Sequence, residues 1–193
     1  VTATNIDLNA TTYTALDGTV AANADVTFTG AVDLTAGAAT TTVTVADDAG
    51  AKITFTSTID DDNAGQTNLT LVAGAGAIDL QGDAGVTTRL GDFTISSAAQ
   101  ADLDDIDADL IAVTATNIDL NATTYTALDG AVKADADVTF TGAVDLMAGG
   151  TTTTVTVAND ADAKITFTST IDDDTAGETN LTLVAGLGSI ELQ

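Results

Sequence analysis

Short runs in which apolar and polar residues alternate recur along the whole chain. In the segment 26–29, VTFT, every second residue is apolar and Thr lies between the apolar positions. This period of two is typical of β-strands with one buried face, and 39 Thr residues supply β-branched side chains for an exposed face. The clearest runs are 5–8, 26–29, 42–45, 53–56, 69–72, 78–80 and 93–96. The pattern predicts an all-β fold in which Thr points outward.

One segment, 98–112, also fits a helix. Leu103, Ile106 and Leu110 follow helical spacing there, but five Asp residues disfavour a helix interior. Its second half alternates with period two, so we predict that this segment is also strand.

A long internal repeat appears when the chain is aligned with itself. Residues 1–81 align with residues 113–193, and only 13 of the 81 aligned pairs differ. The stretch 1–18, VTATNIDLNATTYTALDG, recurs unchanged at 113–130. We therefore divide the chain into a first, 112-residue β-repeat unit, 1–112, and a second, incomplete unit, 113–193, which continues the same array.

Two architectures fit tandem units built from short strands. One is a parallel β-helix, a solenoid in which strands stack from rung to rung; the other is a series of immunoglobulin-like β-sandwiches of about 100 residues each. The chain has no Pro, no Trp and only seven Phe and Tyr residues for a sandwich core, and strand runs recur without pause. These features favour the β-helix. About five rungs per unit would then extend the solenoid by about 24 Å.

The charge is strongly one-sided. Four basic residues stand against 29 acidic ones, which gives a net charge of −25. A polyanion has no basic surface for phosphates and is repelled by anionic lipid, so we expect no nucleic-acid partner and no membrane insertion. Without Cys, disulfides play no part in the stability.

The residues that most enzymes use are missing. The sequence contains no His and no Cys, and its basic residues are Lys52, Arg89, Lys133 and Lys164. Nucleophilic and acid–base catalysis have little to draw on, so we expect no enzyme. A polysaccharide-active β-helix enzyme using paired carboxylates is the less favoured alternative, since enzymes do not normally duplicate identical sites in tandem.

Clusters of Asp are the strongest candidates for ligand chemistry. Asp60, Asp61 and Asp62 follow a predicted strand, and Asp172, Asp173 and Asp174 repeat them. Carboxylates at a turn are the oxygen ligands that calcium takes, so we expect calcium as a candidate ion at these six residues, although no other cofactor is required. Further clusters lie at 102–109 and 47–48. The alternative is that all are solvated turns that keep the protein soluble.

Two other features have a plain structural interpretation. Lys52 and Lys164 occupy equivalent strand starts, where we expect them to offset nearby Asp charge. Thr tracts at 40–44 and 151–156 could form a flat array resembling that of ice-binding proteins. We interpret them instead as ordinary outward strand residues, because they are unevenly spaced in the sequence and Phe interrupts similar tracts.

Four sequence motifs resemble recurring motifs of very large bacterial exoproteins: GAVDL at 30–34, ITFTSTID at 53–60, AGQTNLTLVAG at 64–74 and RLGDFTI at 89–95. They are similar in sequence and in order to the repeats of filamentous-haemagglutinin-like and autotransporter-type adhesins. The resemblance covers nearly the whole chain, although this chain is more acidic and poorer in Asn and Gly. It implies a right-handed parallel β-helix fibre exported to the cell surface.

The function expected from these observations is structural. The chain would be the rod-forming repeat region of a secreted, extracellular fibre or adhesin that gives reach and rigidity for attachment or filament assembly. Expected partners are neighbouring repeats or like chains in a fibre, and host or cell-surface glycans. The alternative is a calcium-stiffened array of β-sandwich adhesin modules.

Overall fold

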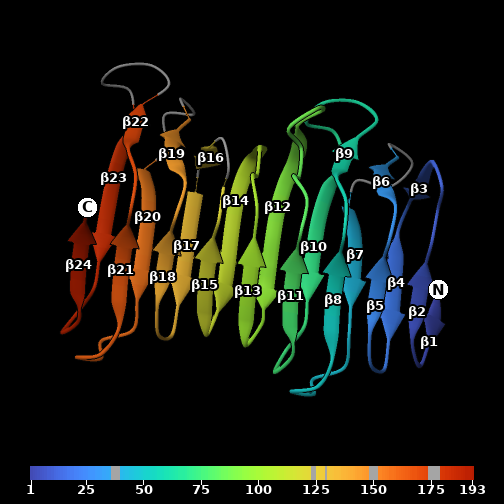
Figure 1. Ribbon diagram of the computed structural model, residues 1–193, viewed down its shortest axis with the longest axis horizontal. Helices are drawn as coiled ribbons and strands as arrows, with labels where there is room; N and C mark the ends of the chain where they lie inside the picture. Colours follow the sequence, from blue (N-terminus) through green and yellow to red (C-terminus); the bar gives the residue numbers. More distant parts are fainter. Residues whose placement is uncertain (36–39, 123–124, 129, 148–151, 174–178) are drawn as a thin grey trace.

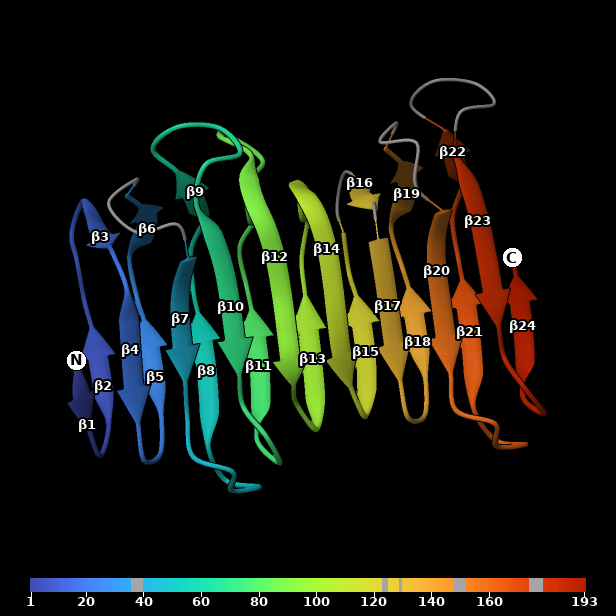
Figure 2. The ribbon, with the colours of Figure 1, turned by 180° about the vertical axis from the view of Figure 1, so that it is seen from behind.

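The chain forms a three-sided solenoid of parallel β-strands (Figures 1 and 2). The computed structural model describes residues 1–193 apart from 36–39, 123–124, 129, 148–151 and 174–178. The two ends of the chain lie at opposite ends of the long axis (Figure 1). None of the described residues form a helix long and apolar enough to cross a bilayer.

Two nine-stranded sheets run the length of the solenoid. Sheet A contains β1 (Thr2–Ala3), β4 (Thr19–Ala22), β7 (Thr40–Thr44), β10 (Asn68–Val72), β12 (Leu90–Ser97), β14 (Ala108–Ala115), β17 (Gly130–Ala134), β20 (Thr152–Val157) and β23 (Asn180–Val184). Sheet B contains β2 (Ile6–Leu8), β5 (Val26–Phe28), β8 (Lys52–Phe55), β11 (Ala77–Leu80), β13 (Gln100–Leu103), β15 (Asn117–Leu120), β18 (Val138–Phe140), β21 (Lys164–Phe167) and β24 (Ser189–Leu192).

The third face is made of two shorter sheets. One contains β3 (Tyr13–Leu16), β6 (Ala31–Leu34) and β9 (Ile59–Asp61), and the other contains β16 (Tyr125–Leu128), β19 (Ala143–Leu146) and β22 (Ile171–Asp173). Between them two rungs cross this face with single bridging residues, Ala84 and Ile106. The third face is therefore interrupted where sheets A and B are continuous.

Each turn of the chain, which we call a rung, adds one strand to sheet A and then one to sheet B. The strands of each sheet pair in parallel, as the register of Ile6 with Val26 and of Val26 with Ile53 illustrates. Immunoglobulin-like sandwiches are antiparallel, so the β-sandwich alternative is wrong for the described chain. The prediction of an all-β solenoid is confirmed.

The rungs differ in length. One inward column of sheet A passes, from each rung to the next, through Val20, Val43, Leu71, Ile95, Val113 and Val132. The longest of these steps is from Val43 to Leu71, and the shortest is from Ile95 to Val113. The strands that meet at the longest step, β7 and β10, have only five residues each, so the extra residues lie in the connections. Val132 corresponds to Val20 in the second copy and lies five rungs beyond it.

The core is a set of apolar columns parallel to the solenoid axis. On sheet B, Phe28 stacks on Phe55 with ring centroids 4.5 Å apart and planes 7° apart. Phe140 and Phe167 repeat this contact at 4.5 Å and 2°. These four rings are buried at 1% exposure or less, because alternation directs every second residue inward and the register places like above like.

Thr follows the same alternation, with a few exceptions to the outward prediction. Thr41 and Thr153 are fully buried, and each Oγ1 donates to a main-chain oxygen inside the solenoid, that of Leu16 at 3.5 Å and that of Leu128 at 3.2 Å. Thr67 and Thr126 are also buried. The prediction that Thr points outward is therefore wrong at these four positions. At Thr41 and Thr153 the buried hydroxyl bonds to a carbonyl, whereas the buried Thr67 Oγ1 has no hydrogen-bond partner.

Segment 98–112 is strand, as predicted. It contains β13 and most of β14, and Ile106 bridges to Ala84 between them. Leu103, Ile106 and Leu110 have helical spacing, but β13 and β14 each pair with a parallel strand on both sides, which favours strand.

We expect Phe55→Ala to lower the free energy of unfolding by about 3–5 kcal/mol, because it removes a buried ring from a stacked column. Thr54→Ala, one residue away on the outer face, should change it by no more than about 0.5 kcal/mol. Thermal unfolding followed by circular dichroism tests both variants. Equal effects of the two changes would contradict this description of the core.

Candidate functional site

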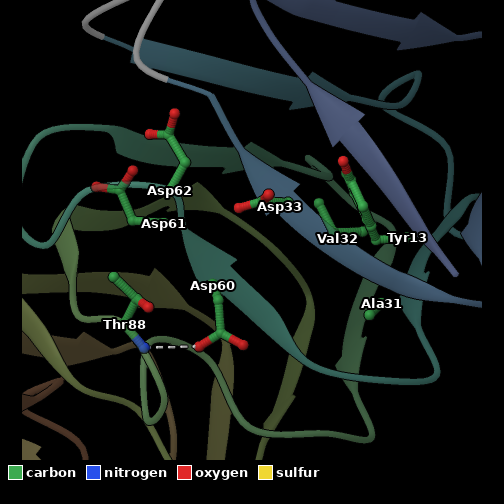
Figure 3. Close-up of a pocket in the computed structure, with 8 residues that line it drawn as sticks. All are labelled: Tyr13, Ala31, Val32, Asp33, Asp60, Asp61, Asp62 and Thr88. Carbon is green, nitrogen blue, oxygen red and sulfur yellow. Dashed lines mark hydrogen bonds between the residues drawn. The ribbon is translucent and has the colours of Figure 1, made fainter.

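The third face gathers carboxylates from two successive rungs. Asp33 on β6, Asp60 and Asp61 on β9, and Asp62 after it border an open hollow of about 400 Å³ (Figure 3). The hollow is completed by Tyr13, Ala31, Val32 and Thr88. The hollow therefore includes all three calcium candidates of the first copy, Asp60, Asp61 and Asp62.

The three consecutive carboxylates do not point the same way. Alternation along β9 leaves Asp60 half-buried and places Asp61 in the interior, at 2% exposure. Figure 3 shows Asp60 turned toward Thr88, with Asp61 and Asp62 on the other side of the strand. The sequence run therefore supplies two separate environments.

Main-chain N–H groups already occupy two of these carboxylates. Asp60 Oδ1 accepts from the backbone nitrogens of Thr87 and Thr88, each at 3.0 Å. Asp61 Oδ2 accepts from the backbone nitrogens of Gln66 at 2.9 Å and Thr67 at 2.7 Å. Asp61 thereby closes the turn that follows β9, which gives it a structural role whether or not an ion binds.

Burial and neighbouring carboxylates both shift the pKa of Asp33. Burial, followed by the nearby carboxylates of Asp62, Asp60 and Asp61, raises its pKa above the usual value of 3.8. Like charges held close together disfavour ionisation. A cation placed here would relieve that repulsion.

The copy of this cluster is described only in part. Asp172 and Asp173 lie on β22, paired with β19 as Asp60 and Asp61 are paired with β6. Asp174 lies outside the described residues. Calcium binding at these six residues stays a prediction.

A second acidic group lies on the interrupted part of the third face. Asp83, Asp104 and Asp105 each bring one carboxylate oxygen within 4.8 Å of the other two, a grouping found among the described residues. Asp83 precedes the bridging residue Ala84, and Asp105 precedes the bridging residue Ile106 on the next rung. The stacking of these two rungs therefore brings together residues that are far apart in the sequence.

Burial and this crowding of carboxylates raise the pKa values of Asp83 and Asp104. Burial, then the carboxylates of Asp105, Asp104 and Asp60, raise the pKa of Asp83. Burial also raises the pKa of Asp104, and Asp105 adds to the shift, while a backbone hydrogen bond from Asp105 opposes it. Asp83 and Asp104 therefore hold protons more tightly than free Asp side chains do, and the three carboxylates could also take up a hard cation with further oxygen ligands.

Sequence reasoning found only part of this group. The Asp-rich segment 102–109 was recognisable, but Asp83 stands alone in the sequence among small residues. The number of residues per rung varies along the chain, as the unequal steps from Val43 to Leu71 and from Ile95 to Val113 show. No fixed spacing could therefore have pointed to Asp83.

Asn and Asp side chains support the turns before sheet B. Asn5 Oδ1 accepts from the nitrogen of Asp25 at 3.2 Å, and Asp25 Oδ1 accepts from the nitrogen of Lys52 at 3.0 Å. The second copy repeats these bonds. Asn117 Oδ1 accepts from the nitrogen of Asp137 at 3.4 Å, and Asp137 Oδ1 accepts from the nitrogen of Lys164 at 2.9 Å. Much of the Asp content therefore satisfies backbone donors.

Both predicted lysine roles are confirmed. Lys52 Nζ lies 2.6 Å from Asp79 Oδ2, and Lys164 Nζ lies 3.4 Å from Glu191 Oε1, in each case one rung later on sheet B. The lysines are about half exposed, so each pair contributes at most about 1 kcal/mol. They offset local charge.

A smaller hollow, of about 170 Å³, lies at the turns before sheet B in the second copy. It is bordered by Asp135, Asp137, Asp160 and Asp162, with Ala136 and Ala163. The corresponding residues of the first copy are Asn23, Asp25, Asp48 and Gly50, so two of the 13 differences add carboxylates in the second copy. Sequence reasoning did not identify this cluster.

We expect Asp83→Asn to raise Tm by a few degrees at about pH 7. The raised pKa means that the folded chain binds this proton more tightly than the unfolded chain. The stability from this group is fully present below its usual pKa of 3.8 and is lost as pH rises through the raised pKa. The variant should therefore flatten the fall of Tm with rising pH.

Thermal unfolding across this pH range, compared with Asp7→Asn on sheet B, is the measurement. Asp7→Asn removes one negative charge far from the group and corrects for the general effect of net charge. Identical pH profiles for the two variants would contradict the proposed crowding.

Comparison with known proteins supplies no relative. No protein-family model, no curated protein and no solved structure matches the chain. Its function therefore has to be inferred from the repeat, the parallel sheets and the distribution of charge.

Proposed function

We propose that this chain is the rod-forming repeat region of a secreted bacterial surface fibre or adhesin. The observation that supports this most directly is the joint between the two copies. Sheet A passes from β12 to β14 with Ile95 in register with Val113, and sheet B passes from β13 to β15 with Gln100 in register with Asn117. An array of units then acts as one continuous rod rather than as separate domains.

Rigidity in this proposal comes from the ladder of main-chain hydrogen bonds. Each strand bonds to the rung before and the rung after it, so bending the rod strains bonds in both long sheets. With rungs about 4.8 Å apart, five rungs in a 112-residue unit extend the rod by about 24 Å. A right-handed winding with a 112-residue structural unit completes the proposed architecture.

The biological role proposed for the rod is reach. It holds an attachment element away from the cell, or it assembles with like chains into an extracellular filament. The resemblance to large bacterial adhesins supports a place at the cell surface, with host or cell-surface glycans as partners beyond the fibre. The net charge of −25 supports solubility and argues against nucleic acid and membrane insertion.

An enzymatic role is less well supported. The sequence lacks His and Cys, and in the hollow of the first copy Asp60 and Asp61 accept backbone hydrogen bonds. A near-identical second unit adds length without adding a new kind of side chain. Both features fit a mechanical part better than a catalyst.

Chains with one, two and three complete units test the rod. Small-angle scattering should show that the rod lengthens by about 24 Å per unit while its cross-section stays constant. Aligned rods should give a diffraction repeat of about 4.8 Å along their axis. Bead-like particles, or a cross-section that grows with unit number, would overturn the proposed function.

Calcium is proposed as an accessory ligand of the third-face clusters, not as a requirement for folding. Millimolar calcium should raise Tm relative to chelator, because a cation relieves repulsion among the grouped carboxylates. Magnesium at equal ionic strength is the control. Equal Tm values in calcium, magnesium and chelator would contradict this assignment.

A further inference from the structure

Charge is unevenly distributed over the three faces of the solenoid. The described strands of sheet A carry two acidic residues and one basic residue, Asp92, Asp109 and Lys133. The strands of sheet B carry Asp7, Lys52, Asp79, Asp102, Asp119, Lys164 and Glu191. Those of the third face carry Asp33, Asp60, Asp61, Asp145, Asp172 and Asp173. One face of a strongly acidic rod is thus close to neutral.

The outer side of sheet A also carries small side chains stacked in a column from rung to rung. Thr19, Thr42, Thr70 and Thr94 pair in sequence on four successive rungs, and the column continues through Ala112, Ala131, Thr154 and Thr182. Thr residues that are unevenly spaced in the sequence therefore lie on successive rungs of one column, which two Ala residues interrupt. The strands of this sheet run downward in Figure 2 along the whole solenoid.

We propose that sheet A is a lateral interface at which a second copy of this chain packs face to face. This inference rests on the proposed rod function and names the surface through which rods associate. Small, stiff β-branched side chains lose little entropy on packing, and their methyl and hydroxyl groups suit a close contact between sheets.

Electrostatics favours this face over the other two. Packed sheets lie about 10 Å apart, and exposed charges are largely screened beyond about 8 Å at physiological ionic strength. Pairing through sheet A keeps the acidic faces of both rods on the outside. Pairing through sheet B or the third face would press carboxylates against carboxylates.

The available area is sufficient for a weak pair and increases with length. Nine strands about 4.8 Å apart and about five residues wide give a flat surface of about 600 Å² on each copy. The total, about 1,200 Å², is at the lower limit for specific interfaces, and every added unit enlarges it.

The same distribution limits the assembly to two rods. Face-to-face contact uses the same surface on both copies, so it closes after one pairing. The remaining faces are acidic and repel further rods. A ribbon of two rods follows, rather than a bundle without limit.

Matched Thr substitutions on two faces test this surface. Thr70→Glu with Thr154→Glu puts two charges on sheet A, and Thr54→Glu with Thr166→Glu puts two on sheet B, all at half-buried outward positions. Sedimentation velocity should show concentration-dependent doubling of mass for the unmodified chain and for the sheet B variant. The sheet A variant should pair at least tenfold more weakly, and added salt should partly restore pairing.

Circular dichroism and Tm establish that each variant folds, and single Glu substitutions replace any double variant that does not. A rod of the expected length that stays single at every concentration, or that pairs equally well with charged sheet A, would overturn this interface while leaving the rod intact. Loss of pairing only on charging sheet B would assign the contact elsewhere and also overturn it. A chain that is not rod-shaped would instead refute the proposed function.

Discussion

Parallel pairing between successive rungs is the constraint on which the rest of the structure depends. Each strand contributes only a few residues, so no strand is stable alone, and its hydrogen bonds come from the rungs on either side. The register that satisfies those bonds also stacks inward residues in columns, as with Phe28 on Phe55. A shift by one residue would turn every apolar side chain outward, so the core and the ladder fix each other.

The acidic composition has to be accommodated within this ladder. Some carboxylates accept main-chain N–H groups at turns, as Asp25 does from Lys52 and Asp61 does from Thr67. Others pair with the lysines of sheet B one rung away. Where neither solution applies fully, at Asp83 and Asp104, burial and then the neighbouring carboxylates raise the pKa values. Negative charge is therefore concentrated on two faces, and sheet A stays nearly neutral.

In the proposed pairing, this separation lets the acidic faces keep rods apart in most orientations. The Thr-rich face would then provide the one orientation in which two rods meet. Repetition favours such a mechanical role, because each unit extends every face at once. In residues 82–112 single bridging residues replace the strands of the third face, and the sheet A strands β12 and β14 are longer than the others. Sheets A and B cross that region without interruption.

The sequence by itself determined the strands, the 112-residue repeat, the lack of common catalytic residues and the charge-offsetting lysines. Alternation decides which side chains share a face, so these features could be predicted locally. It does not decide which strands pair, because successive partners are separated by unequal stretches of chain. Only the tertiary structure therefore aligned Thr19 with Thr42, buried Thr41 and brought Asp83 to Asp104 and Asp105. The physical reason is that the lengths of the connections, rather than the strand pattern, set the rung on which each residue meets its neighbours.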